Sequence, residues 1–254
     1  MLTDCVPSKS LISTAHVLPR FETAHEHGVE LTLGAIPADL RAVNHRIIGL
    51  ATAQSEDIAT RLVAEGVRVC RGTGRLRSAS GVAVEYADGT TEDLDADVVL
   101  LATGATPRVT DTARPDGERI LTWKQLYALT EVPERLIVVG SGVTGAELAQ
   151  AYLGFGGQVT LVSSRDRVLP GEDSDAAQVI EDVFRREGML VLSRSRMSAV
   201  ERVGDGVRVQ LEDGRMVDAS HVLLAVGSVP QTSGIGLEQV GVECSPSGNG
   251  ARAR

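Results

Sequence analysis

The glycine-rich stretch at residues 140–147 constrains the fold of this chain more than any other feature. It reads Gly-Ser-Gly-Val-Thr-Gly-Ala-Glu, the pattern G-x-G-x-x-G-x-E, and it directly follows the apolar run Leu136–Val139. A buried strand that leads through this pattern into a helix is the context of a dinucleotide-binding βαβ unit. Gly140 permits the tight turn, Gly142 lets a pyrophosphate approach the backbone, and Gly145 lets helix and strand pack closely. The helix N-terminus then presents N–H groups and a positive dipole end to the phosphates.

The residues after this turn continue the alternation of strand and helix. The patterns predict a helix over 144–153, a strand over 158–162, a helix over 174–187 and a strand over 189–192. An alternation β-α-β-α-β predicts a parallel sheet with right-handed crossovers. Three further runs, 207–211, 215–219 and 221–225, predict a β-meander.

The N-terminal half begins with helical patterns and then changes period. We predict a helix over 8–25 with Pro7 near its start, and a long helix over 39–65 that Gly66 ends. Short strands follow at 67–70, 82–86 and 91–94, then an apolar strand at 97–101, while Gly72–Thr73–Gly74 by itself is interpreted as a turn. Each half ends in hairpin strands and an apolar strand that runs into a glycine, which predicts two related nucleotide-binding folds.

The residues at the end of the second strand bear on which nucleotide is bound. An NAD site has an acidic residue there, about 20 residues after the glycine turn, which binds the ribose 2′-hydroxyl. Here Ser163, Ser164 and Arg165 follow strand 158–162, and Arg167 comes two residues later. The acidic residue is absent, and the two arginines suit a 2′-phosphate. NADPH and NADH both stay open, because the arginines have an alternative interpretation as solvated loop charges.

Composition excludes several classes of protein. Of the 254 residues, 43% are hydrophobic and 23% are charged, which is typical of a globular chain. The formal charge of −9 argues against a nucleic-acid or anionic-membrane partner, because phosphates repel an acidic surface. No apolar run approaches the ~18 residues of a membrane span, and the first residues lack the apolar segment of a signal peptide. Three scattered cysteines are too few for a disulfide scaffold, so we expect a reducing, cytoplasmic location.

Cys5 stands just before the predicted helix 8–25, and Lys9 follows one turn later. A helix N-terminus and a nearby ammonium group both favour a thiolate, which makes Cys5 a candidate reactive thiol. The alternative is a buried structural cysteine, the commoner role of an isolated one. No cysteines have the spacing of a metal site, so no metal is predicted.

Three motifs in order carry a family resemblance. Cys-Val-Pro-Ser-Lys at 5–9, Leu-Leu-Ala-Thr-Gly-Ala at 100–105 and the glycine turn at 140–147 resemble the flavoprotein pyridine nucleotide-disulfide oxidoreductases. That family includes dihydrolipoamide dehydrogenase and glutathione reductase. Residues 2–9 and the Gly-Ser-Val-Pro of 227–230 look most like its branch of NAD(P)H quinone reductases.

The resemblance implies an α/β fold with two Rossmann-like nucleotide-binding domains, each with a β-meander. A partial FAD-binding domain would occupy residues 1–112 and a complete NAD(P)-binding domain residues 113–232. Residues 233–254 would form a returning segment and a disordered tail.

The resemblance also implies roles for the residues that match its motifs. Cys5 would be the thiol next to the flavin, Lys9 would lie beside the flavin, and Glu147 near the nicotinamide; these are the predicted catalytic residues. The predicted FAD contacts are Lys9, Gly74, Thr103, Gly104 and Ala105. The predicted NAD(P)H contacts are Gly140, Ser141, Gly142, Val143, Thr144, Gly145, Ala146, Glu147, Ser163, Ser164 and Arg165, with Met197 and Gly227 lining the same cleft.

The sequence also departs from the family pattern. The family's FAD-binding glycine motif lies upstream of the cysteine motif, whereas this chain begins four residues before Cys5. The second cysteine of the redox disulfide, the late flavin-binding Gly-Asp motif and the C-terminal dimerisation domain with its His-Glu pair are missing too. We therefore expect a chain truncated at both ends, with exposed strand edges and apolar faces in its partial domain.

The leading hypothesis is a FAD-dependent NAD(P)H oxidoreductase. Hydride would pass from the nicotinamide to the flavin and on to a quinone-type acceptor, and the full-length parent would be a homodimer. One alternative is a disulfide reductase such as dihydrolipoamide dehydrogenase. A second alternative, of a different class, is a non-catalytic NAD(P)-binding fragment of such an enzyme.

Overall fold

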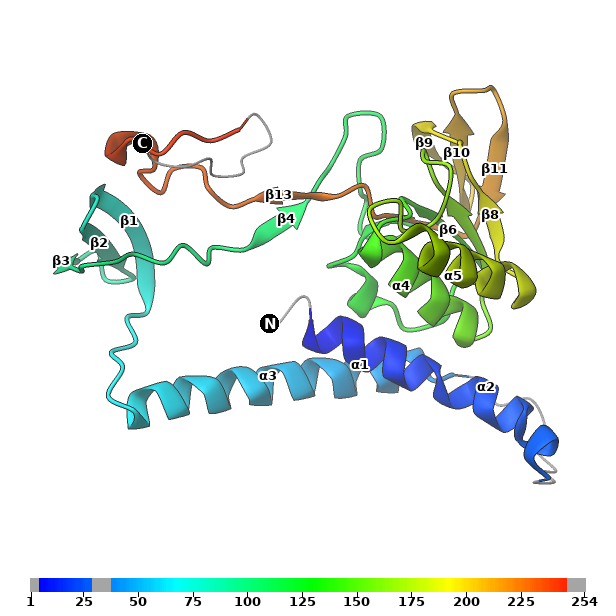
Figure 1. Cartoon of the computed structure of the whole chain (residues 1–254), viewed down its shortest axis with the longest axis horizontal. Coiled ribbons are helices and arrows are strands. Elements are labelled where there is room, and N and C mark those ends of the chain that lie inside the picture. Colours follow the sequence, from blue (N-terminus) through cyan, green and yellow to red (C-terminus); the bar gives the residue numbers. More distant parts are fainter. Residues whose placement is uncertain (1–4, 29–37, 246–254) are drawn as a thin grey trace. The chain divides into compact units, whose positions relative to one another are not determined.

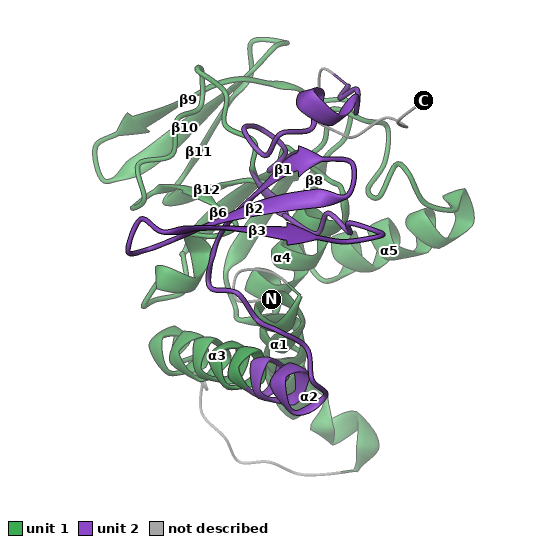
Figure 2. Ribbon diagram, turned by 90° about the vertical axis from the view of Figure 1, so that its left-hand side faces the viewer, with its two compact units in different colours: residues 1–56, 107–227 green, residues 57–106, 228–254 purple. Residues whose placement is uncertain are grey.

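A computed structural model of the chain describes residues 5–28 and 38–245. The chain divides into two compact units, coloured separately in Figure 2: residues 1–56 with 107–227, and residues 57–106 with 228–254. The long helix α3 (Leu40–Ala64) begins in the first unit and ends in the second. Within the described ranges, no helix is both long enough and apolar enough to cross a membrane.

The first unit is built on a five-stranded parallel sheet (Figure 1). Helix α4 (Val143–Gly154) connects β6 to β7, and α5 (Ser174–Arg186) connects β7 to β8. The predicted α/β fold and its β-α-β-α-β order are thereby confirmed. Along the sheet the order is β5 (Ile120–Thr122), β12 (His221–Leu224), β6 (Arg135–Val139), β7 (Gln158–Val162) and β8 (Leu190–Leu192).

This strand order reverses direction between β12 and β6. From β6 the chain adds β7 and then β8 on one side of β6. It later returns and adds β12 on the other side of β6. In open α/β sheets such a switch point forms a crevice beyond the carboxyl ends of the strands, where ligands bind. The topology therefore puts the candidate site at the ends of β6 and β12.

Two hydrophobic cores flank the parallel sheet. Successive residues of β6 alternate between them, because side chains of a strand point to opposite faces. Leu136 and Val138 join a core shared with the helices, while Ile137 and Val139 join a core on the other face. An antiparallel sheet covers that second face, in the order β11 (Met216–Ala219), β10 (Gly206–Leu211) and β9 (Met197–Val203).

The N-terminal helices belong to the first unit. The single helix predicted over 8–25 is divided into α1 (Val6–Ala15), α2 (Val17–Glu22) and the 3₁₀ turn η1 (Ala24–His27). Helix α1 packs on α4 through small residues: a Cβ added to Gly154 would lie 3.0 Å from the carbonyl oxygen of Ala15. The long predicted helix is confirmed as α3.

The second unit contains a three-stranded antiparallel sheet of β1 (Gly72–Ser78), β2 (Gly81–Tyr86) and β3 (Thr91–Asp95). The C-terminal segment with η3 (Glu238–Val240) lies against β1, and the Leu76 N–H donates to the Ile235 carbonyl at 2.8 Å. A short ladder joins β4 (Ala105–Pro107) to β13 (Ser228–Pro230). In the first unit, the 3₁₀ turn η2 (Leu126–Ala128) follows β5.

Several sequence predictions are wrong in this part of the chain. Residues 67–70 form no strand, and Gly72–Thr73–Gly74 is not a turn but the beginning of β1. The predicted strand 97–101 is also absent, and Val98 and Leu100 are 84% and 88% exposed. A strand of this apolar kind is stable between hydrogen-bonded neighbours, and the described residues provide none for it. Val98 and Leu100 are thus exposed apolar side chains, as expected for this part of the chain.

The meander also differs from its prediction. Its third strand is β9, which the sequence did not reveal, whereas the predicted strand 221–225 corresponds to β12 and enters the parallel sheet. β12 is buried along its whole length, which suits a central parallel strand. The predicted tail over residues 246–254 lies outside the described residues.

Candidate functional site

The glycine turn lies at the switch point of the sheet and is shaped by close backbone contacts. Gly140 follows β6 with φ 111°, in the region that favours glycine, and a Cβ there would collide with the carbonyl oxygen of Ala225 after β12. A Cβ at Gly145 would collide with the carbonyl oxygen of Gly140. At Gly142, by contrast, a Cβ would meet no atom within 4 Å. Two glycines are thus required by the fold itself, and the third faces open space.

Helix α4 begins at this open space. Gly142 is its N-cap, with φ −69° and no capping hydrogen bond from a side chain. The first N–H groups of a helix have no partner inside the helix, and the dipole makes that end positive. Gly142, Val143 and Thr144 are all exposed there. The arrangement is suited to a phosphate or pyrophosphate group.

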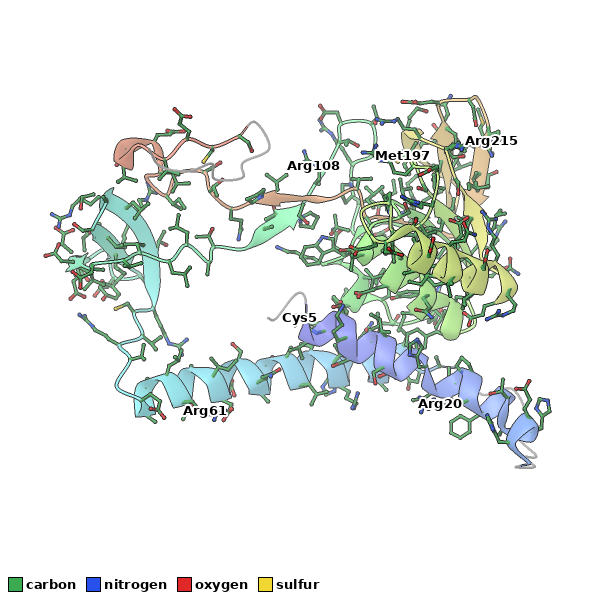
Figure 3. All side chains as sticks on the ribbon, viewed as in Figure 1. Cys5, Arg20, Arg61, Arg108, Met197 and Arg215 are labelled. Carbon is green, nitrogen blue, oxygen red and sulfur yellow. The ribbon has the colours of Figure 1, made fainter. Side chains whose placement is uncertain are left out.

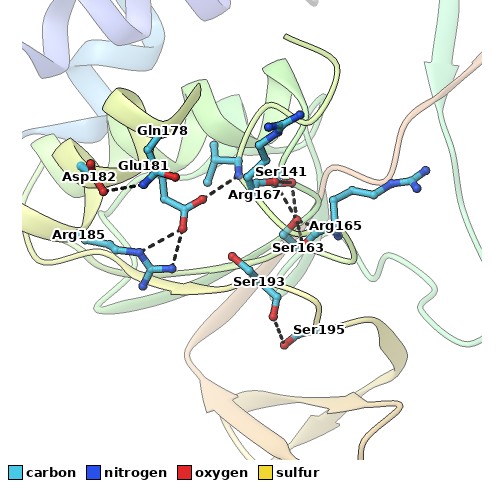
Figure 4. A network of polar contacts seen from close by, with 11 residues as sticks. Ser141, Ser163, Arg165, Arg167, Gln178, Glu181, Asp182, Arg185, Ser193 and Ser195 are labelled. Atoms are coloured by element: carbon cyan, nitrogen blue, oxygen red, sulfur yellow. Dashed lines mark hydrogen bonds and ion pairs between the residues drawn. The ribbon is translucent and has the colours of Figure 1, made fainter. Parts of the chain in front are cut away.

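Ser141 and Ala146, two predicted nucleotide contacts, have buried side chains. The Ser141 hydroxyl oxygen lies 2.7 Å from that of Ser163, the first residue after β7. Ser163 is fully buried, and its hydroxyl oxygen accepts the N–H of Arg165 at 3.1 Å. These serines join the glycine turn to the loop after β7 (Figure 4).

Glu181 of α5 fixes the same loop, and sequence reasoning missed it. Its Oε2 accepts the N–H of Val168 at 3.0 Å, and its Oε1 accepts from the Arg185 guanidinium at 2.7 Å (Figure 4). Its spacing in the sequence could have indicated this role, because Glu181 lies on the buried face of α5 together with Ala177 and Phe184. A carboxylate on such a stripe indicates a bound donor.

Lys9 and Glu147, two of the predicted catalytic residues, form an ion pair between α1 and α4. Their side chains are 59% and 30% exposed, and Glu147 lies two residues after Gly145. Cys5 is the N-cap of α1, and its carbonyl accepts the Lys9 N–H at 2.9 Å. Cys5 is exposed and has φ 65° (Figure 3). The interpretation of Cys5 as a buried structural cysteine is therefore wrong.

The residues predicted to contact FAD, apart from Lys9, belong to the second unit. Gly74 lies in β1 opposite Val84. The carbonyls of Thr103 and Gly104 accept from Gln231, at 2.7 Å from its side chain and 2.9 Å from its backbone. Gly104 has φ 74°, which allows this bend. No pattern in the sequence pointed to Gln231.

The residues predicted to line the nicotinamide cleft lie after β12 and in β9. Gly227 has φ 100°, and its carbonyl accepts the N–H of Arg108 at 2.9 Å. Met197 is the first residue of β9 and is paired with Leu211 (Figure 3). Both residues belong to the same unit as the glycine turn.

Two side chains with shifted pKa values, Asp116 and His221, lie at the opposite end of the sheet from the glycine turn, where β5 and β12 begin. Burial raises the pKa of Asp116, but N–H groups of Ile120, Glu118 and Arg119 at 2.8 Å outweigh it and lower that pKa to about 2. Burial, with the nearby charge of Arg119, lowers the pKa of His221 to about 4. Both groups lie at the end of the sheet opposite the glycine turn and are not part of the candidate nucleotide site. The described residues contain no group of His, Cys, Asp and Glu able to hold a metal ion.

Comparison with known proteins agrees with this geometry. The sequence pattern of the pyridine nucleotide-disulphide oxidoreductase family matches residues 1–251. An NAD(P)H dehydrogenase (quinone) of Mycobacterium tuberculosis is 47% identical over 96% of this chain and 50% of its own length. A dihydrolipoyl dehydrogenase of Bacillus subtilis is 33% identical over 96% of this chain and 53% of its own length. The chain thus spans about half the length of the curated relatives it matches.

Solved structures agree in fold. The crystal structure of LpdA from Mycobacterium tuberculosis matches 97% of this chain and 54% of that chain, with a TM-score of 0.88 and 45% identity. The flavoprotein disulfide reductase RclA of Escherichia coli matches with a TM-score of 0.78 at 20% identity, which supports the fold alone. Together with the glycine turn at the switch point, these matches establish that the chain belongs to the pyridine nucleotide-disulphide oxidoreductase family, which implies FAD and NAD(P)H as cofactors.

Proposed function

We propose that this chain binds NAD(P)H at residues 140–147 and acts in a FAD-dependent oxidoreductase that reduces a quinone-type acceptor. One observation carries the nucleotide site: at the switch point, Gly140 and Gly145 are held by the protein's own backbone, while Gly142 opens the helix N-terminus to a ligand. The 47% identical relative is an NAD(P)H dehydrogenase (quinone), which supports the acceptor.

The residues present fit NAD(P)H. Gly142 leaves room for a pyrophosphate, and the first turn of α4 supplies donors to it. When bound, the nicotinamide supplies a hydride. The protein's part is to orient the nucleotide and to hold charge near it, and Glu147 is fixed for that purpose by Lys9.

The described residues account for FAD less completely. A second glycine-rich turn from strand to helix, which would hold the FAD pyrophosphate, does not occur in residues 5–28 or 38–245. The expected contacts at Gly74 and at 103–105 lie in a strand and in a segment bound to Gln231. We therefore derive no chemical step through the flavin from this chain.

A disulfide reductase is the second candidate, because dihydrolipoyl dehydrogenases are also relatives. Its support in the structure is Cys5, an exposed thiol at the start of a helix. The lower identity, 33% against 47%, favours the quinone acceptor. We also propose a cytoplasmic location, in keeping with the small number of cysteines, and a homodimer for the full-length enzyme.

The test has a binding arm and an acceptor arm. The purified chain is titrated with NADH and with NADPH, and the quenching of Trp123 fluorescence or the heat of binding is recorded. The chain supplied with FAD is then assayed for oxidation of the nucleotide by a benzoquinone and, separately, by lipoamide. We expect nucleotide binding and oxidation by the quinone. Failure of a folded chain to bind either nucleotide would refute the proposal, and oxidation by lipoamide alone would favour the disulfide reductase.

Binding without oxidation by either acceptor would identify a non-catalytic NAD(P)-binding chain. A variant Cys5→Ser serves as the matched control for the lipoamide arm. Its hydroxyl preserves the size of the side chain but not the redox chemistry of the thiol. Quinone reduction should be retained in this variant, whereas any lipoamide reduction should be lost.

A further inference from the structure

The loop that follows β7 contains a strained residue, Leu169. Its φ is 50°, in the left-handed region that residues with a side chain rarely adopt. The Leu169 N–H donates to the carbonyl of Ser141 in the glycine turn at 2.8 Å, and its carbonyl accepts the N–H of Glu172 at 3.0 Å. Such a conformation persists only where the surrounding structure fixes the residues next to it.

Glu181 of α5 fixes the residue before Leu169. Its Oε2 accepts the N–H of Val168 at 3.0 Å, and Val168 is fully buried. Glu181 is only 7% exposed, so little water competes for this carboxylate. Its Oε1 accepts from Nη2 and Nε of Arg185, at 2.7 and 3.2 Å, which holds the carboxylate in this orientation (Figure 4). The charge of Glu181 is therefore directed at one backbone group of the loop.

The bond between Glu181 and Val168 is one that the loop cannot easily replace. A hydrogen bond to a charged acceptor is stronger than one between neutral groups, and a buried N–H that loses its acceptor is costly. Without the carboxylate, the loop has to move until the Val168 N–H reaches water, and Leu169 then loses the support of its left-handed backbone. The conformation of the loop thus depends on α5, a helix that contains none of the predicted nucleotide contacts.

This loop borders one end of a nucleotide bound at the glycine turn. In dinucleotide-binding folds the ribose of the adenosine lies at the end of the second strand, which here is β7 with Ser163 after it. The nicotinamide lies across the switch point. The glycine turn between them has its own support, because Gly140 fits closely against the backbone after β12. A shift of the loop should therefore affect the two ends of the nucleotide differently.

We propose that Glu181 is a positioning residue for the nucleotide. By holding the Val168 N–H, it keeps the loop after β7 in the conformation that accepts the adenosine end. Glu181 acts through the backbone of Val168 and Leu169, and not by contact with the nucleotide. The inference rests on the proposed function, since it concerns the same bound nucleotide.

Three variants separate this role from a general role in stability. Glu181→Met has a side chain of similar length that accepts no strong hydrogen bond, whereas Glu181→Gln keeps an oxygen that accepts the Val168 N–H. The side chain of Arg185 is 45% exposed, so it can turn into water, away from the new amide group. Asp182→Ala is the matched control, because it removes a carboxylate from the exposed face of the same helix. Circular dichroism and urea unfolding give the fold and the stability of each variant.

Each protein is titrated by calorimetry with three probes. These are the dinucleotide that the unaltered chain binds more tightly (NADH or NADPH), 5′-AMP for the adenosine end, and reduced nicotinamide mononucleotide for the nicotinamide end. Glu181→Met should bind the dinucleotide and 5′-AMP about tenfold more weakly, because affinity falls with the fraction of molecules whose loop keeps the binding conformation. Its binding of the mononucleotide should be nearly unchanged. Glu181→Gln should regain most of the lost affinity, and Asp182→Ala should match the unaltered chain.

Hydrogen exchange in the unaltered chain gives a second readout, which does not depend on the folding of a variant. A ligand that requires one conformation of a segment stabilises that segment against opening. We therefore expect 5′-AMP to slow the exchange of residues 163–169, and reduced nicotinamide mononucleotide to leave it unchanged.

The outcomes separate the two proposals. In Glu181→Met, full affinity for 5′-AMP, or equal weakening of 5′-AMP and the mononucleotide, would overturn this inference and leave the proposed function intact. So would a failure of Glu181→Gln to regain affinity, or a failure of 5′-AMP to slow exchange in residues 163–169. A folded, unaltered chain that binds neither dinucleotide would overturn the proposed function, and this inference with it.

Discussion

The glycines of the turn have different roles: Gly140 and Gly145 are required for folding, and Gly142 leaves room for the ligand. Substitutions at Gly142 and Gly145 can separate these two roles. At Gly142, an alanine Cβ would meet no protein atom within 4 Å, and φ −69° suits any residue. The cost of Gly142→Ala to the fold is the difference between glycine and alanine as an N-cap, about 0.5–1 kcal/mol. The same methyl group would occupy the space through which a pyrophosphate approaches. Loss of one or two charged hydrogen bonds, about 2–3 kcal/mol, weakens NADPH binding about thirty- to hundredfold.

Gly145→Ala should behave in the reverse way. Its Cβ would collide with the carbonyl oxygen of Gly140 and lie 3.3 Å from the Ala225 Cβ, so the turn must move away from β12. Overpacking of this kind costs about 1–3 kcal/mol of folding free energy. Urea unfolding gives the stability of each variant, and titration with NADPH gives its affinity. The reasoning is refuted if Gly142→Ala binds NADPH as the unaltered chain does, or if Gly145→Ala is as stable as that chain.

Three further substitutions test other parts of the structure. Tyr152→Phe removes a buried hydroxyl that has no partner among the described residues, so thermal unfolding should show a gain of about 1 kcal/mol; a loss would reveal a hidden partner. Glu147→Gln breaks the partly exposed pair with Lys9 and should cost less than about 1 kcal/mol in urea, and a cost above twice that would contradict its surface character. In His221→Gln, stability should depend less on pH between about 6.5 and 4. The unfolded His221 binds a proton near pH 6.5 but the folded one only near pH 4, so the unaltered chain loses up to about 3 kcal/mol as pH falls through that range. Parallel stability–pH curves for the two proteins would refute this.

The parallel sheet could be predicted from the sequence because two signals coincided there. Buried strands such as β6 are runs of apolar residues, and the glycines after β6 indicate both the turn and its ligand. The candidate residues Lys9 and Glu147 came from the family resemblance, and their ion pair was not predicted, since no local pattern relates residues 138 positions apart. The glycine turn, by contrast, could be predicted from contiguous residues alone, because its pattern lies within residues 140–147.

The remaining errors have physical causes. β9 has four half-buried residues followed by three exposed ones, with no alternation of burial along the strand, so it lacked the sequence signal of a strand. Residues 97–101 are apolar but form no strand. A strand needs adjacent hydrogen-bonded strands, and these come from other parts of a sequence. The contacts of Ser163 with Ser141 and of Glu181 with Val168 depend on side chains that meet only after folding.

The alternation of β6 between two cores also fixes where the glycine turn can be. Leu136 and Val138 face the helices, and Ile137 and Val139 face the meander, so inserting one residue would exchange the two sets and rotate everything after the strand by half a turn. Gly140 would then lose its close backbone contact with the carbonyl of Ala225. The length of this strand is therefore adjustable only in steps of two residues, and evolution could shift the phosphate end of the site along the sheet only in increments of about 7 Å.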